Sequence, residues 1–194
     1  ASAENPFGNP ALLCALNGDN NQSVEWCEVG YDDSKWMKAE RTDIPQGTLH
    51  GQITEGMRVL RNIKPTSVIR TDSSVIVDLG QNLAGWLKVN MRGNQGDTIK
   101  IVFAEKLDNE GKLYRKNLRT AYTTDYYVCN GKEANGRWWT PTFVYHGFRY
   151  AEVFGLKNAE LDDFEGQLVA DLMEETGYFE CSDSVLNKVM RNAW

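Results

Sequence analysis

Long apolar runs and an excess of basic charge are both missing from this sequence. No run approaches the roughly 18 apolar residues that a membrane-spanning helix needs. Lys and Arg number 21 against 27 Asp and Glu, which gives a net charge of -6. Because nucleic-acid and anionic-membrane sites need a clustered basic face, we expect neither partner, and a neutral or weakly charged ligand is favoured.

Histidine and cysteine are also scarce. His50 and His146 lie far apart in the sequence, so they predict neither a metal site nor a Ser-His triad, and we expect His146 to be a hydrogen-bonded structural residue. The cysteines are Cys14, Cys27, Cys129 and Cys181. Their spacing contains no C-x-x-C pair, which removes zinc ribbons and thioredoxin-like chemistry. Cys14 and Cys27 could form a disulfide or remain free thiols, so they leave the redox compartment open.

Paired carboxylates are present, but their spacing does not predict a catalytic site. Glycoside hydrolysis normally needs two carboxylates about 5 to 9.5 Å apart across a cleft, one of them with a raised pKa. The adjacent acidic pairs are Asp32/Asp33, Asp162/Asp163 and Glu174/Glu175. They lie in predicted turns or at strand edges, so we expect solvated turn carboxylates. We predict no catalytic residue, no metal site and no cofactor.

What the sequence does contain is a repeated strand pattern. From Trp86 to Arg92 apolar and polar side chains alternate, which is typical of a half-buried antiparallel strand. Gly80 and Gly85 precede it, and we predict a sheet-to-sheet corner between them. The predicted strands are Val68–Arg70, Val75–Leu79, Trp86–Arg92, Thr98–Ala104, Thr124–Cys129, Thr142–Tyr145, Arg149–Phe154 and Phe164–Ala170, with an edge strand near Met57. Short strands with turn signals about every 10 residues predict an all-β, antiparallel β-sandwich.

The ends of the chain differ from this central pattern. Ser182–Ser184 has the composition of a helix cap, and apolar residues then recur at helical spacing. They are Val185, Leu186, Val189 and Met190. Because an isolated helix of about three turns is marginal in water, we expect it to be the first helix of a further domain that is missing here.

Four parts are therefore predicted. Residues 1–45 form the C-terminal part of a preceding sandwich, 46–66 a Pro- and Gly-interrupted connector, 67–175 the main sandwich, and 176–194 a linker and the first helix of the missing domain. The D-D-S-K-W sequence at 32–36 resembles the end of galactose-binding-type sandwiches, which suggests the character of the first part.

Exposed aromatic side chains are the remaining candidates for a ligand site. Sugar sites stack the apolar ring face on an aromatic side chain beside amide, carboxylate and Arg groups. The candidates are Trp86, Trp138, Trp139, Tyr114 and Tyr122. The alternative is that most of them fill the sandwich core or seal it against the missing domain, and the sequence leaves both interpretations open.

Six ordered motifs resemble a known family. They are D-L-G-Q-N-L-A-G-W (78–86), A-E-K-L-D-N-E-G-K-L-Y (104–114), N-L-R-T-A (117–121), D-Y-Y (125–127), W-T-P-T-F-V-Y-H-G-F-R-Y (139–150) and G-Y-F-E-C-S-D (177–183). Together they are similar to the bacterial α-L-rhamnosidases of glycoside hydrolase family 78. The resemblance implies a sandwich of jelly-roll or concanavalin-like type that precedes an (α/α)6 barrel, and the barrel carries the inverting acid and base carboxylates.

Three hypotheses follow from the resemblance and the residues. In the first, the chain is a non-catalytic accessory sandwich, inactive alone, whose parent hydrolyses terminal α-L-rhamnosides and whose partner is the parent's own helical domain. In the second, it is a carbohydrate-binding module for glycans containing rhamnose. In the third, it is a protein-interaction domain. A secreted or periplasmic location is expected rather than a cytoplasmic one.

Overall fold

The structure is a computed structural model that describes residues 29–193, apart from 31, 42, 44, 45, 49 and 175. Cys14, Cys27 and most of the predicted preceding sandwich lie outside these residues. The described residues between 29 and 56 form turns and loops and contain no strand. No helix in the described part of the chain has the length and apolar character needed to cross a bilayer.

The described residues form ten antiparallel strands. They are β1 Met57–Ile63, β2 Ser67–Arg70, β3 Ser74–Met91, β4 Thr98–Ala104, β5 Lys106–Leu107, β6 Leu113–Tyr114, β7 Thr124–Val128, β8 Arg137–Trp139, β9 His146–Phe154 and β10 Phe164–Asp171. Eight of them form one sheet in the order β1-β10-β3-β9-β4-β7, with β2 and β8 also paired to β3, and β5 and β6 form a separate hairpin. The part of the chain that the structure describes also contains two 3-10 turns, η2 Lys116–Leu118 and η3 Leu161–Asp163, and the helix α2 Ser184–Ala193.

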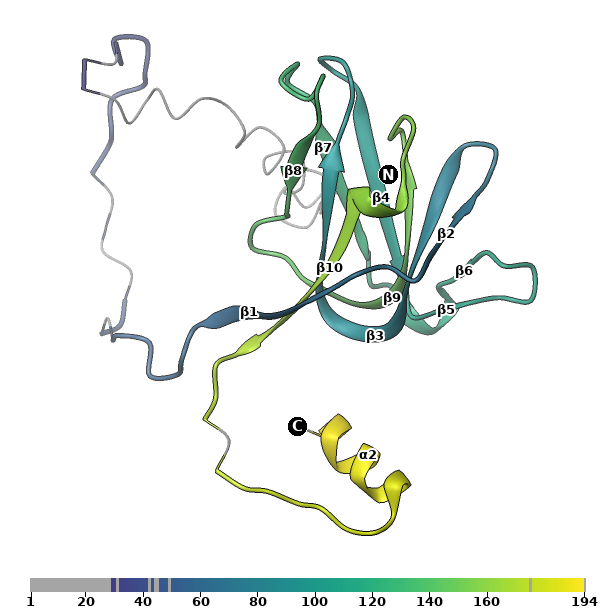
Figure 1. Ribbon diagram of the computed structural model, residues 1–194. Coiled ribbons are helices and arrows are strands. Elements are labelled where there is room, and N and C mark those ends of the chain that lie inside the picture. The colour runs from purple at the N-terminus through teal and green to yellow at the C-terminus, as the bar shows by residue number, and fades with distance from the viewer. Residues whose placement is uncertain are drawn as a thin grey trace.

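Strand β3 is the element that folds this sheet into a sandwich. Its first part, 74–78, pairs with β2 and β9, and its last part, 85–91, pairs with β10 and β8. Between the two parts the pairing with β9 jumps from Asp78↔Tyr150 to Leu83↔Phe148. The chain bends sharply at this irregularity, at the lower end of the sandwich in Figure 1. The two halves of the curled sheet therefore face each other as two layers.

The predicted corner is present, although its form differs from the prediction. The chain bends within one continuous 18-residue strand, and not in a turn between two separate strands. Gly80 has a φ of +73°, a conformation that side chains other than glycine rarely adopt. Its N–H donates to Asp78 Oδ1 over 2.7 Å. Gly85 has another role, because a Cβ there would lie 1.9 Å from the carbonyl oxygen of Gln167 on β10.

The core lies between the two layers, and strand periodicity predicts its position on β3. Leu87, Val89 and Met91 are completely buried, while Trp86 and Lys88, at alternate positions of the strand, are partly exposed. The other large core side chains include Val75, Val77, Leu79, Ile99, Ile101, Phe103, Tyr127, Trp139, Phe148, Val153 and Phe164. The all-β antiparallel sandwich predicted from the sequence is thus the observed fold.

One detail of the sequence-based strand assignment is wrong. Residues Thr142–Tyr145, predicted as a strand, form a bend and loop, and the pairing segment lies earlier, at β8. Pro141 interrupts the segment, and Phe143 has a φ of +63°, which is incompatible with a regular strand. The edge strand predicted near Met57 is confirmed as β1, which begins at Met57 and pairs with β10.

Helix α2 begins where the cap pattern places it. Asp183 accepts hydrogen bonds from the backbone N–H groups of Val185 at 2.8 Å and Leu186 at 3.3 Å, as an N-cap side chain does. Residues 176–183 before it contain no strand. The helix buries none of its described side chains.

Candidate functional site

The five aromatic candidates do not converge on one site. Trp139 belongs to the core, with 6% of its surface exposed and its ring centroid 5.4 Å from that of Tyr127. It has no free face on which a sugar could stack. Tyr114 lies on β6 under the ammonium group of Lys106, and Tyr122 shares a 2.8 Å hydrogen bond with the hydroxyl of Tyr126.

Trp86 and Trp138 lie on the outer face of the layer formed by β1, β10, the end of β3, and β8. Trp138 pairs with Asn90 and is 47% exposed. The ammonium group of Lys88 lies 5.0 Å from the centroid of the Trp138 ring. The Lys88 ammonium group therefore already occupies one face of the Trp138 ring. Sugar stacking on this side of the sandwich stays a prediction.

The polar groups of this face largely satisfy one another across the strands. Trp86 Nε1 donates to Gln167 Oε1 at 2.7 Å, and Gln167 Nε2 donates to Asn62 Oδ1 at 3.1 Å. Lys88 Nζ donates to Glu165 Oε1 at 3.2 Å. These are directly opposed cross-strand pairs, which stabilise a sheet. The arrangement indicates a well-ordered outer surface.

Asp163 corrects one sequence-based prediction. This side chain is buried rather than solvated, because it forms an ion pair with Arg92 and accepts a hydrogen bond from Asn90 Nδ2 at 3.1 Å. Burial acts to raise the pKa of Asp163, but the hydrogen bonds from Arg92, the Glu160 N–H and Asn90 outweigh it and lower that pKa. The carboxylate therefore anchors η3 to the sheet.

The two other buried carboxylates also have structural partners. Asp125 Oδ1 lies 2.9 Å from His146 Nε2, and the His146 ring stacks on Phe103 with centroids 4.5 Å apart. This confirms that His146 is a hydrogen-bonded structural residue. Glu133 accepts hydrogen bonds from the Tyr127 hydroxyl at 2.6 Å and the Gly131 N–H at 2.9 Å.

The remaining reactive groups are a cysteine thiol and the side chains that could bind a metal ion. Cys129 is a free, buried thiol, and burial raises its pKa to about 11. Such a thiol is unreactive near neutral pH. Across the described ranges, no group of three or more His, Cys, Asp or Glu side chains is placed to hold a metal ion.

The other layer carries a hollow on its outer face, between the sheet and the loop of the β5–β6 hairpin. We call it the hairpin hollow, and its volume is about 630 Å³. It is lined by Ile69, Thr71, Ile76, Lys100, Val102, Glu110, Gly111, Lys112, Leu113, Arg115, Glu152 and Phe154. In Figure 1 the β2 and β5–β6 hairpins project on the same side of the sandwich. The fold thus forms a concave surface away from Trp86 and Trp138.

The hairpin hollow is not among the predicted sites, although two residues of the sequence indicate it. Ile76 and Val102 occupy the outward positions of β3 and β4, where strand alternation predicts polar side chains. Both are buried, yet neither belongs to the core between the layers. An apolar residue at an outward position indicates that another segment covers it.

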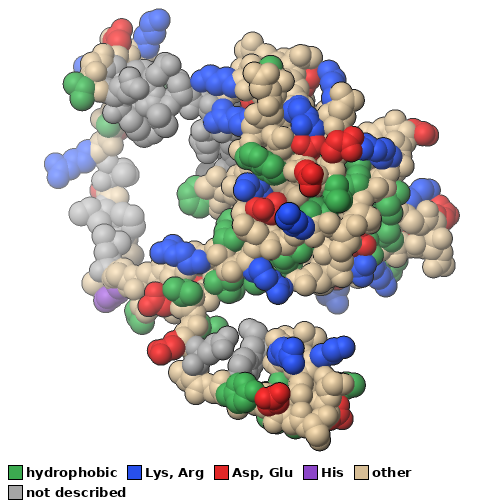
Figure 2. Space-filling model, viewed as in Figure 1, with side chains coloured by type: hydrophobic (Ala, Val, Ile, Leu, Met, Phe, Trp, Pro, Cys, Tyr) green, Lys and Arg blue, Asp and Glu red, His purple; other side chains and the backbone are tan. Residues whose placement is uncertain are grey.

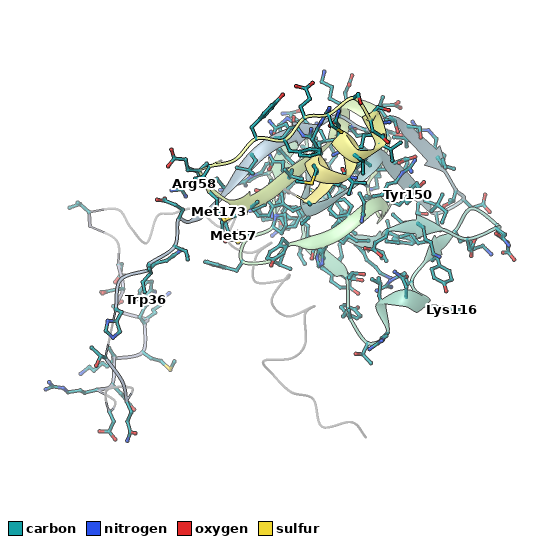
Figure 3. The ribbon with its side chains drawn as sticks, turned by 90° about the horizontal axis from the view of Figure 1, so that it is seen from below. Trp36, Met57, Arg58, Lys116, Tyr150 and Met173 are labelled. Atoms are coloured by element: carbon teal, nitrogen blue, oxygen red, sulfur yellow. The ribbon has the colours of Figure 1, made fainter. Side chains whose placement is uncertain are left out.

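Exposed apolar side chains also occur after the last strand, in the segment that follows β10 and in α2 (Figure 1). They are Leu172, Met173, Tyr178, Phe179, Val185, Leu186 and Val189. Met57 and Met173 lie side by side where β1 begins and β10 ends (Figure 3), in keeping with the pairing of Met57 and Asp171. Figure 2 shows hydrophobic side chains on the surface of α2, at the bottom of the view. We call this set the C-terminal apolar surface.

Comparison with known proteins assigns the sandwich to a family. Residues 69–170 match the family described as the bacterial alpha-L-rhamnosidase concanavalin-like domain. The chain belongs to this α-L-rhamnosidase domain family. The matched range runs from β2 to β10 and so includes the β3 bend and the hairpin hollow.

Individual α-L-rhamnosidases agree with this assignment. An α-L-rhamnosidase of Formosa agariphila is 33% identical over 175 residues, which cover 85% of this chain and 18% of the relative. The solved α-L-rhamnosidase from Dictyoglumus thermophilum aligns with a TM-score of 0.77 and 35% identity over 84% of this chain and 19% of that one. The Streptomyces avermitilis α-L-rhamnosidase, solved with L-rhamnose, aligns with a TM-score of 0.76 and 29% identity over 87% and 16%.

The family assignment confirms the resemblance seen in the six motifs. The chain spans less than a fifth of the length of these α-L-rhamnosidases, 18% and 19% for two curated relatives. It therefore corresponds to an accessory domain within a much larger α-L-rhamnosidase architecture.

Proposed function

We propose that this chain is the accessory β-sandwich of an α-L-rhamnosidase, and that the rest of the parent protein hydrolyses terminal α-L-rhamnosides with inversion. The role of the chain itself is structural, because it supports one side of the parent's helical catalytic domain. The observation that carries the proposal is the C-terminal apolar surface, which continues directly from the last strand of the sandwich into α2.

The energetics of this surface favour a protein partner. Burying an exposed Val or Leu side chain stabilises a protein by about 1.5–3 kcal/mol. Val185, Leu186 and Val189 on α2 are all more than half exposed. A helix of 10 residues is also marginal on its own in water. Packing on a helical neighbour would therefore stabilise both the helix and the surface.

The carboxylates of the sandwich support a non-catalytic role. A glycosidase general acid needs a raised pKa. The pKa values of the buried groups Glu133 and Asp163 are instead lowered by their hydrogen bonds, which outweigh the opposing effect of burial. Each of these carboxylates is already bound to a side chain of the sandwich, Tyr127 or Arg92.

An activity assay tests the proposal. The 194-residue chain and the full-length parent are purified in the same way and incubated with 4-nitrophenyl α-L-rhamnopyranoside. We expect turnover by the parent and none by the chain. Turnover that co-elutes with the chain through gel filtration, at a constant specific activity, would overturn the proposal.

A further inference from the structure

The loop between β8 and β9 exposes two aromatic side chains. Phe143 is 98% exposed and Tyr145 is 55% exposed, and the loop bulges away from the sheet in Figure 1. Of the large hydrophobic side chains described between Met57 and Asp171, Phe143 is the most exposed. A Phe side chain stabilises a protein when it is buried, and in this chain Phe143 contributes almost no such stabilisation.

The backbone holds Phe143 in an unfavourable conformation. Its φ of +63° is an outlier for a bulky side chain, and such a conformation persists only where the surrounding structure fixes it. Trp139 and Pro141 are buried before Phe143. His146 is buried after it, with its Nε2 atom 2.9 Å from Asp125 Oδ1. The fold therefore keeps a strained, exposed Phe between two buried anchors.

The composition of the loop favours a protein partner over a sugar. From Pro141 to Tyr145 the polar side-chain groups are the hydroxyls of Thr142 and Tyr145. A sugar site places amide, carboxylate or Arg groups beside the aromatic ring, and this segment supplies none of them. A projecting Phe instead matches the aromatic anchors that fill apolar pockets at the centre of protein interfaces.

The loop joins the sheet close to the point where the chain leaves the sandwich. Gly85 of β3 pairs with His146 at the start of β9 on one side and with Leu168 of β10 on the other. Two strand spacings separate His146 from Leu168, which is about 10 Å. β10 ends soon after, and residues 172–183 connect it to α2. Because a connection of this length spans at most about 40 Å, a domain that begins with α2 is held within reach of the loop.

From these observations we infer that Phe143 is an anchor that inserts into an apolar pocket on the parent's helical domain. The inference rests on the proposed function and adds to it a second contact, separate from α2. The chain spans 18% and 19% of two curated relatives, so most of such a parent lies outside this chain. Insertion would bury the Phe143 ring, and this gain would offset the strain of its backbone.

Photochemical cross-linking in the full-length parent identifies what covers Phe143. With p-benzoylphenylalanine in place of Phe143, we expect irradiation to give a cross-link to a peptide of the helical domain, C-terminal to residue 194. The same group in place of Leu161, on η3 before the start of β10, is the control and should give no such cross-link. A cross-link from position 143 to the region before Met57, or to a second parent molecule, would overturn the inference.

Cleavage of the connection measures how strongly Phe143 holds the two domains together. Tyr178 is 81% exposed in this chain, and in the parent chymotrypsin should cut after it only when the domains separate. Phe143→Ala should raise this cleavage rate about ten-fold through loss of an interface anchor, and Leu161→Ala should not. In the 194-residue chain the unfolding midpoint of Phe143→Ala should match wild type, because the side chain is exposed there. Equal cleavage rates of wild-type parent and Phe143→Ala would contradict the inference.

Hydrogen exchange of the α2 amides in the same parent separates two kinds of failure. If the cross-link is absent while α2 is protected, the anchor is refuted and the proposed function stands. If the cross-link is absent and α2 exchanges as rapidly in the parent as in the chain, both the anchor and the structural role of the sandwich are refuted.

Discussion

Asp78 and Arg149 form a double hydrogen-bonded ion pair at the bend of β3. Arg149 Nε donates to Asp78 Oδ1 at 2.8 Å, and Arg149 Nη2 donates to Asp78 Oδ2 at 2.9 Å. Asp78 is the last residue paired before the irregularity, and it also accepts the N–H of Gly80. One carboxylate therefore links β9 to the bend that turns one sheet into two layers.

Loss of this ion pair should destabilise the sandwich. We expect Asp78→Asn to lower the free energy of unfolding by about 1–2 kcal/mol, because it removes a charge-assisted pair at a half-buried site. Urea unfolding at neutral pH measures the difference. Arg70→Ala is the matched control, since the Arg70–Glu160 pair is exposed and should contribute less than about 0.5 kcal/mol. Equal effects of the two substitutions would contradict a special role for the bend.

The same ion pair makes a prediction about pH. The hydrogen bond from Arg149 lowers the pKa of Asp78 below its usual value, an effect that outweighs partial burial. A lowered folded-state pKa stabilises the protein above the unfolded-state pKa, about 3.9, and this contribution is lost as the pH falls through the folded-state value. The stability difference between wild type and Asp78→Asn should therefore shrink below about pH 4. A constant difference from pH 7 to pH 2.5 would show that the charge is irrelevant.

Close approach of two strands gives a second prediction. A Cβ on Gly85 would lie 1.9 Å from the Gln167 carbonyl oxygen, so Gly85→Ala must displace the backbone of β10. We expect a loss of about 3 kcal/mol or more, or failure to fold. Gly147→Ala is the control, because no heavy atom lies within 4 Å of a Cβ there. Thermal unfolding midpoints that fall equally for both variants would be inconsistent with the β3–β10 packing.

The buried carboxylate of Glu133 gives a third prediction. Burial acts to raise the pKa of Glu133, but hydrogen bonds from Tyr127 and from the Asn130 and Gly131 N–H groups outweigh it and lower that pKa. Glu133→Gln places an amide NH2 group against these donors and should cost about 2–3 kcal/mol near neutral pH. The cost should diminish as the pH falls below about 4.3, where the unfolded-state carboxylate becomes protonated.

Denaturant unfolding at pH 7, 5 and 3 measures this pH dependence. Glu174→Gln is the control, since Glu174 is exposed and its replacement should have little effect at any pH. A cost for Glu133→Gln that rose towards acidic pH would reverse the predicted sign and rule out a stabilising carboxylate.

Local periodicity was sufficient to predict most of the fold. Alternation in Trp86–Arg92 identified which side chains of β3 are buried, and the composition of Ser182–Ser184 identified the start of α2. The error at Thr142–Tyr145 arose because the segment has the composition of a strand. Phe143 has a positive φ and lies between β8 and β9, which both pair with β3, and the local sequence pattern shows neither feature.

The candidate sites depended much more on the tertiary structure. Trp138 and Trp139 are adjacent and must point to opposite faces, but only the pairing of β8 with β3 shows which one enters the core. Asp163 is buried because Arg92, which is distant in the sequence, lies beside it. The hairpin hollow forms because a loop folds back over Ile76 and Val102. Strand alternation shows that these residues are apolar and point outward, but it does not show which segment covers them.

Hydrogen exchange of the α2 amides, compared between the 194-residue chain and the full-length parent, tests the structural role most directly. In the chain alone, the amides of Ser184–Ala193 should exchange rapidly, because this helix buries no described side chain. In the parent, packing on the helical domain should protect them at least about 100-fold, while the amides of β3 remain slow in both proteins. Equally rapid exchange of α2 in both proteins would contradict the proposal that this surface joins the sandwich to the catalytic domain.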